Sequence, residues 1–178
     1  MSGTDILVAT IGDVARIEQA PFAERCNIAS TYELLHASAM RHGEREALVF
    51  VPKGSADEPP FVYSYADLFR RVTQAANLFH RLGVGPTDVV AYALPSLPQT
   101  HFALWGGEAA GIACAVNPLL EAKHMVEILR AAGAKVLVTL GPGAGGELWD
   151  KMAAVVEQVP TLETVLQVSL AQYFVPGF

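Results

Sequence analysis

The chain has 178 residues, enough for one domain with a hydrophobic core and too few for two domains of ordinary size. Its 12 basic and 18 acidic residues give a formal net charge of −6 without long runs, which argues against binding to nucleic acid or to an anionic membrane. Apolar residues make up 52% of the chain and the mean hydropathy is +0.32, so we expect a folded core and room for exposed apolar surface.

The N-terminal segment, MSGTDILVATIGDV, lacks the basic flank and the unbroken apolar stretch of a secretory signal, so a cytoplasmic location is expected. The most hydrophobic stretch, residues 101–120, is interrupted by Glu108, Asn117 and Pro118. It therefore falls short of the roughly 20 apolar residues that a membrane span needs, and we predict no transmembrane segment.

Residues 1–30 are expected to form an N-terminal extension with one weak helix between residues 5 and 18. Apolar side chains recur there at helical spacing, at Ile6, Leu7, Val8, Ile11, Val14 and Ile17. A stronger helix is predicted over residues 30–43. Ser30 and Glu33 have the spacing of a capping box at its start, and Gly43 closes it.

Two strands are predicted next, at residues 46–51 and 61–65, because both segments are rich in β-branched and aromatic residues. The polar, proline-rich segment between them, PKGSADEPP, predicts an exposed hairpin-like loop. Ser64 and Asp67 then open a long amphipathic helix over residues 65–82. Its apolar residues fall at helical intervals, at Leu68, Val72, Ala75, Ala76, Phe79 and Leu82.

The rest of the chain alternates between strand and helix patterns. Strands are predicted at 89–95, 112–116, 134–140 and 164–170, and helices at 96–111, 121–133 and 147–159. Such alternation implies βαβ crossovers and predicts the α/β class, with a mostly parallel sheet and helices on both faces. The last eight residues, AQYFVPGF, show no periodicity.

A glycine-rich loop, TLGPGAGGELW, lies between a predicted strand and a predicted helix and offers the one hint of a cofactor site. Gly141, Gly143 and Gly146 satisfy the GxGxxG spacing of dinucleotide-binding loops in the strand-to-helix context that this motif requires. Such loops hold a pyrophosphate with backbone N–H groups, and Pro142 removes one of these donors. The loop lacks a Gly-Lys-Ser/Thr ending, so it is not a P-loop.

Dinucleotide binding also needs an acidic residue at the carboxyl end of the next strand, where it holds the ribose. That end reads Ser169, Leu170 and Ala171, without an acid. Glu163 lies at about the sequence distance from the glycine loop that the motif requires. It precedes the strand, however, and is expected at the opposite edge of the sheet. We therefore interpret the loop as a strand-to-helix connection and keep dinucleotide binding as an alternative.

Other side chains with catalytic or metal-binding chemistry form no recognisable cluster. The histidines show no HxxxH or HExxH spacing and are interpreted as surface or partly packed helix residues: His36, His42, His80, His101 and His124. Cys26 and Cys114 are far apart and lack a CxxC neighbour, so they are interpreted as ordinary thiols. Glu108 lies in an apolar segment and is expected to reach solvent or a backbone donor. We predict no catalytic, cofactor-binding or metal-binding residue in this chain.

Several motifs in order along residues 30–170 resemble the N-terminal part of the adenylate-forming acyl-CoA synthetases of the AMP-binding superfamily. They are the strand entry YSY, the turn LGVGPTDVV, the segment LPSLP before a Gly-Ala helix, the turn NPLL and the strand AGAKVLVT. Ser96 and Gln99 depart from the resemblance, since the family more often has Asn and Glu in a P-N-x-P-E turn. That turn is interpreted as structural.

The resemblance implies the Rossmann-like layered N-terminal subdomain of the acyl-CoA synthetase fold. It also implies a parent enzyme that uses ATP, magnesium and coenzyme A to convert a fatty or other apolar acid to an acyl-adenylate and then to a thioester. The family's phosphate loop, which is rich in Ser, Thr and Gly and ends in Pro-Lys, does not occur in residues 139–178. The chain alone is therefore expected to bind none of these cofactors and to be inactive.

This interpretation divides the chain into an extension (1–30), an α/β subdomain (31–170) and a tail at a truncation point (171–178). Its expected partners are the remaining domains of the parent enzyme, and without them an exposed apolar patch is expected to promote self-association. Two alternatives stay open: a non-catalytic module that assembles with another chain, and a freestanding dinucleotide-binding domain.

Overall fold

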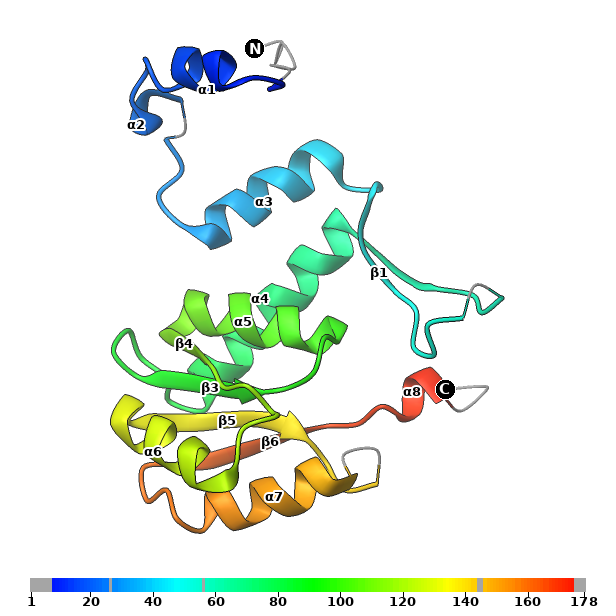
Figure 1. Ribbon diagram of the computed structural model, residues 1–178, viewed down its shortest axis with the longest axis vertical. Helices are drawn as coiled ribbons and strands as arrows, with labels where there is room; N and C mark the ends of the chain where they lie inside the picture. Colours follow the sequence, from blue (N-terminus) through cyan, green and yellow to red (C-terminus); the bar gives the residue numbers. More distant parts are fainter. Residues whose placement is uncertain (1–7, 26, 56, 144–145, 175–178) are drawn as a thin grey trace. The chain divides into compact units, whose positions relative to one another are not determined.

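The computed structural model describes residues 8–25, 27–55, 57–143 and 146–174 (Figure 1). The chain forms two compact units, Met1–Ser30 and Thr31–Phe178. The first unit holds the helices α1 (Ile11–Ile17) and α2 (Phe22–Arg25), neither of which buries a residue. The helix predicted between residues 5 and 18 is confirmed over the span of α1. Residues 5–7 of the predicted segment lie outside the described residues.

The second unit begins with helix α3 (Thr31–His42) and the hairpin of β1 (Glu46–Phe50) and β2 (Phe61–Ser64). The two strands pair antiparallel, with Phe50 opposite Phe61, so the predicted hairpin is confirmed.

Helix α4 (Tyr65–Arg81) confirms the predicted capping box at its start. The Ser64 hydroxyl accepts the N–H of Asp67 at 3.1 Å, and the Asp67 carboxylate accepts the N–H of Ser64 at 3.3 Å. The buried side chains of this helix lie three or four residues apart, at Leu68, Val72, Ala76 and Phe79. Gly83 then reverses the chain with a φ of 76°.

The main sheet contains β3 (Val89–Ala93), β4 (Ile112–Ala115), β5 (Ala134–Leu140) and β6 (Thr164–Val168). Its strand order is β4-β3-β5-β6, and every neighbouring pair is parallel. The helices α5 (Pro98–Ala110), α6 (Ala122–Ala132) and α7 (Gly146–Val156) connect the strands in turn. The predicted α/β class with a parallel sheet is confirmed.

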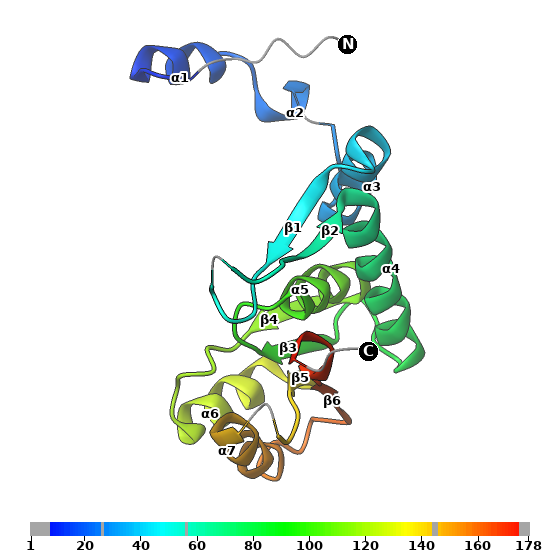
Figure 2. The ribbon, with the colours of Figure 1, turned by 90° about the vertical axis from the view of Figure 1, so that its right-hand side faces the viewer.

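Two hydrophobic cores lie on opposite faces of this sheet. Alternate residues of β3 divide between them: Ala91 packs with Met125 of α6 and Met152 of α7, whereas Val90 packs with Phe79 of α4 and with α5. Figures 1 and 2 show the two pairs of helices with the sheet between them. The sheet thus lies between two layers of helices.

The segment after β6 differs from the expectation, because residues Ala171–Phe174 form a short helix, α8. Its Tyr173 is buried, at 7% exposure, and its ring packs edge-on against Phe50 of β1 and Phe61 of β2, with centroid distances of 4.9 and 4.8 Å. One turn of helix is too short to show a period, so this element follows from tertiary packing.

Candidate functional site

The carboxyl edge of the main sheet has the topology at which open parallel sheets bind ligands. Strands β3 and β5 are neighbours in the sheet, and Ala93 of β3 pairs with Thr139 of β5. After β3 the chain continues into α5 on one face of the sheet, whereas after β5 it continues into α7 on the other face. In open parallel sheets such a reversal creates the crevice where ligands bind. The described start of the GPGAGG loop, residues 141–143, follows β5 directly and therefore lies at this point.

The described glycines of that loop have structural reasons to be glycine. Gly141 is buried and donates its N–H to the Val168 carbonyl at 3.0 Å, and a Cβ on it would lie 3.2 Å from the side chain of Gln167. Gly143 and Gly146 adopt φ values of 85° and 42°, in the left-handed region that favours glycine. These conformations suit a tight connection between β5 and α7, whether or not a ligand binds.

The acid that a dinucleotide site requires is missing from the expected edge. Glu163 donates its backbone N–H to the carbonyl of Lys135, at the beginning of β5, and so lies at the amino edge of the sheet. At the carboxyl edge, β6 runs through Ser169 and Leu170 into α8. The residues beyond β6 thus bring an aromatic ring to this edge in place of a ribose-binding carboxylate.

Tyr173 joins this edge to the rest of the unit through hydrogen bonds. The Gln99 amide nitrogen donates to the Tyr173 hydroxyl at 2.9 Å, and the hydroxyls of Tyr63 and Tyr173 lie 3.3 Å apart. Gln99 lies in the first turn of α5, in the turn where the sequence departs from the P-N-x-P-E pattern. Its side chain connects that turn to α8, a contact that sequence reasoning missed.

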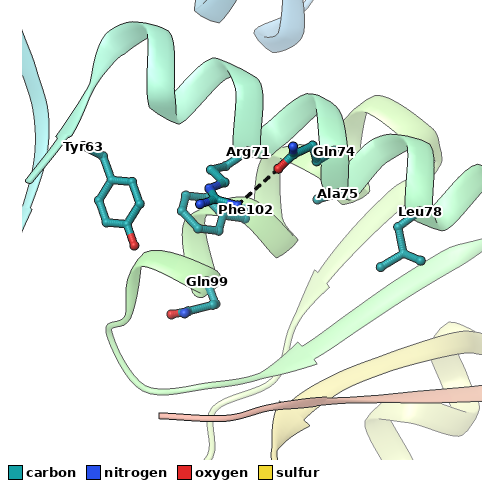
Figure 3. A pocket seen from close by; sticks show the side chains of 7 residues that line it. All are labelled: Tyr63, Arg71, Gln74, Ala75, Leu78, Gln99 and Phe102. Atoms are coloured by element: carbon teal, nitrogen blue, oxygen red, sulfur yellow. Dashed lines mark hydrogen bonds between the residues drawn. The ribbon is translucent and has the colours of Figure 1, made fainter. Parts of the chain in front are cut away.

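A pocket of about 290 Å³ lies beside these residues, between β2, α4 and α5 (Figure 3). It is lined by Tyr63, Arg71, Gln74, Ala75, Leu78, Gln99 and Phe102. Tyr63 and Phe102 form one wall, with ring centroids 5.6 Å apart. Arg71 donates to the Gln74 side-chain oxygen at 3.4 Å. Sequence reasoning missed the pocket because its residues come from three elements.

The histidines stay separate from one another, as their spacing predicted. His80 contacts the Val84 carbonyl through Nδ1 at 3.2 Å, and the remaining four are exposed or only partly buried: His36, His42, His101 and His124. Burial lowers the pKa of His101, whose ring packs on Trp105. Among the residues that the structure describes, no group of three or more His, Cys, Asp or Glu side chains could hold a metal ion.

The remaining candidates from the sequence are Glu108 and the two cysteines. Glu108 is exposed at the surface of α5, as expected. Cys114 is a half-buried free thiol on β4, and burial raises its pKa. Burial likewise raises the pKa of the neighbouring Tyr92, with Cys114 and Glu108 adding smaller effects. Cys26 lies outside the described residues. Across the described ranges, every helix is too short or too polar to cross a lipid bilayer.

Comparisons with known proteins agree on one family. A family model described as AMP-binding enzyme matches residues 35–174. The marinolic acid–CoA ligase of a Pseudoalteromonas strain is 33% identical over 148 residues, which are 83% of this chain and 23% of that protein. The chain thus spans less than a quarter of that relative's length.

Solved structures share the fold. The fatty acyl CoA synthetase of Mycobacterium tuberculosis matches with a TM-score of 0.65 and 22% identity, over 79% of this chain and 27% of that chain. The anthranilate CoA ligase AuaEII, solved in complex with anthranoyl-AMP, matches with a TM-score of 0.68 and 18% identity, over 88% of this chain and 28% of that one. Both likenesses support the N-terminal layered α/β architecture.

Proposed function

Since the chain belongs to the family of AMP-binding enzymes, we propose that it is the N-terminal portion of an ATP-dependent acyl-CoA synthetase. In the parent enzyme, a carboxylate attacks the α-phosphorus of ATP, which forms an acyl-adenylate and releases pyrophosphate. The thiol of coenzyme A then displaces AMP and forms the thioester. The observation that carries this proposal is the family match over residues 35–174, which covers the whole main sheet.

The proposed substrate is a fatty or other apolar carboxylic acid. Support comes from the names of similar proteins, which include a marinolic acid–CoA ligase and a fatty acyl CoA synthetase. The cytoplasm, where ATP and coenzyme A are both available, is the compartment that we propose for this reaction.

We further propose that this chain alone is inactive and that the sites for ATP, magnesium and coenzyme A lie in the remaining domains. The Ser/Thr/Gly-rich phosphate loop ending in Pro-Lys is absent from residues 139–178. The one glycine-rich loop at the switch point of the sheet has the structural roles described above. Stabilising the charge on the transferring phosphate requires preorganised donors, and we propose that the remaining domains supply them.

The proposed partners of the chain are those remaining domains. Val49 and Val62 face each other across the β1–β2 hairpin and stay 50% and 43% exposed, so the hairpin presents two adjacent apolar side chains at its surface. Contact with further domains would cover them. Without that contact, the same apolar surface supports self-association, which light scattering on the isolated chain measures directly.

The experiment that tests the proposal is to read the coding DNA beyond the codon for Phe178. A reading frame that continues into a Ser/Thr/Gly-Pro-Lys loop supports the synthetase. A stop codon in the native gene would contradict it and favour the alternative of a non-catalytic module that assembles with another chain. Saturable binding of NAD to the isolated chain would instead favour the dinucleotide-binding alternative.

A further inference from the structure

The pocket between β2, α4 and α5 combines one unpaired cation with an apolar floor. Of its seven lining residues, only Arg71 carries a charge. Its side chain is exposed and donates to the neutral Gln74 amide oxygen at 3.4 Å. By contrast, the neighbouring Arg70 pairs with the Asp67 carboxylate at 2.6 Å. No ion pair within the described part of the chain includes Arg71.

The walls of the pocket are held in place by contacts outside it. Ala75 lies at a close approach of α4 and α5, because a Cβ added to Gly106 of α5 would come within 2.6 Å of its Cβ. On the polar side, the Tyr173 hydroxyl holds both the Gln99 amide and the Tyr63 hydroxyl. These contacts fix the floor and one wall before any ligand arrives, which reduces the entropic cost of binding.

From this chemistry we propose that the pocket binds a small aromatic monocarboxylate, with its carboxylate on Arg71 and its ring against Phe102, Ala75 and Leu78. A guanidinium binds a carboxylate through two parallel hydrogen bonds. A volume of about 290 Å³ lies at the lower end of small-molecule pockets, which suits a single ring better than a long chain. Arg71 supplies a single positive charge in a chain of net charge −6, so the pocket balances the charge of a monoanion better than that of a phosphate dianion.

The site would be separate from the acyl-adenylate chemistry, and the inference does not depend on the proposed function. Its test uses the 178-residue chain alone, without ATP or coenzyme A. Benzoate is the probe, and its binding is followed by two-dimensional NMR of the ¹⁵N-labelled protein. A ligand of about nine non-hydrogen atoms is expected to bind in the millimolar range.

Three comparisons decide the outcome. Arg71→Gln should weaken benzoate binding about tenfold or more, because a charge-assisted hydrogen bond is lost. Arg81→Gln, at an exposed arginine of the same helix outside the pocket, should leave binding unchanged. Benzamide, which has the same ring without the charge, should bind at least about tenfold more weakly than benzoate.

Circular dichroism shows whether each variant is folded, and the benzamide comparison needs no variant at all. The proposal is overturned if benzoate causes no shifts near Phe102, if benzamide binds as well as benzoate, or if folded Arg71→Gln binds normally. Inorganic phosphate that displaces benzoate at equal concentration would also overturn it, because the site would then be a general anion site.

Discussion

The close approach of α4 and α5 at Gly106 makes a quantitative prediction. A Cβ at this position would lie 2.6 Å from the Cβ of Ala75 and 3.1 Å from the backbone nitrogen of Ala76. Ordinary carbon–carbon contact is about 3.5–4.0 Å, so the helices would have to separate by about 1 Å. Overpacking costs about 1–3 kcal/mol, and the backbone contact favours the upper end of that range.

Replacing glycine by alanine inside a helix returns about 1 kcal/mol through helix propensity. Gly106→Ala should therefore lower the free energy of unfolding by about 2 kcal/mol, or the melting temperature by about 4–8 °C for a chain of this size. Urea and thermal unfolding followed by circular dichroism measure both quantities.

The adjacent glycine provides the matched control for this substitution. A Cβ at Gly107 would lie 3.4 Å from the Cβ atoms of Ala113 and Val90, which is ordinary van der Waals contact. Gly107→Ala gains the same helix propensity without the clash, so its stability should equal the wild type or exceed it by up to about 1 kcal/mol. The reasoning is refuted if Gly106→Ala is as stable as the wild type, or if both substitutions destabilise equally.

Three further predictions concern local contacts of the same unit. Ser64→Ala should cost about 1 kcal/mol in urea unfolding, because it removes the N-cap of α4; an unchanged midpoint would contradict the role of the cap. Gly111→Ala should destabilise more than Gly106→Ala, since the new Cβ would lie 2.5 and 2.7 Å from the carbonyl oxygens of Asp88 and Gly85; equal melting temperatures would count against this. The pKa of Asp88 lies below its usual 3.8, chiefly because its carboxylate accepts the Gly85 N–H and secondly because of Lys135. The stability that this carboxylate contributes to the fold is therefore present above pH 3.8 and is lost as the pH falls through the lowered pKa. The stability difference between wild type and Asp88→Asn should accordingly shrink toward pH 3, and a difference that stays constant from pH 7 to pH 3 would disprove the assignment.

Local patterns account for most of the fold that could be predicted. The buried strand β3 is a continuous apolar run, and β5 is apolar except for Lys135 and Thr139. The stripe from Leu68 to Phe79 has the helical period, so each element is encoded in its own segment. The pairing of β3 with both β4 and β5 depends on which helix covers which face, and a single segment does not specify that. Helix α8 is likewise held by Tyr173 packing on Phe50, more than 100 residues earlier in the chain.

The candidate pocket was less predictable for the same reason. Arg71 and Gln74 are ordinary residues on the polar side of an amphipathic helix, and Gln99 stood out only as a departure from a family turn. The contact between α4 and α5 at Gly106 brings these side chains together with Phe102. Such a juxtaposition depends on helix packing and leaves no periodic signal in the sequence.

The central claim, that the chain is an N-terminal portion of an acyl-CoA synthetase, is tested most directly by acid-dependent exchange of pyrophosphate into ATP. The assay compares this 178-residue chain with the full-length product of its native gene, using fatty and aromatic carboxylic acids. The account predicts exchange only by the full-length enzyme, since residues 139–178 contain no Ser/Thr/Gly-rich loop ending in Pro-Lys. Exchange catalysed by the isolated chain would contradict its predicted inactivity, and no exchange by a folded full-length product with any of these acids would contradict the proposed function.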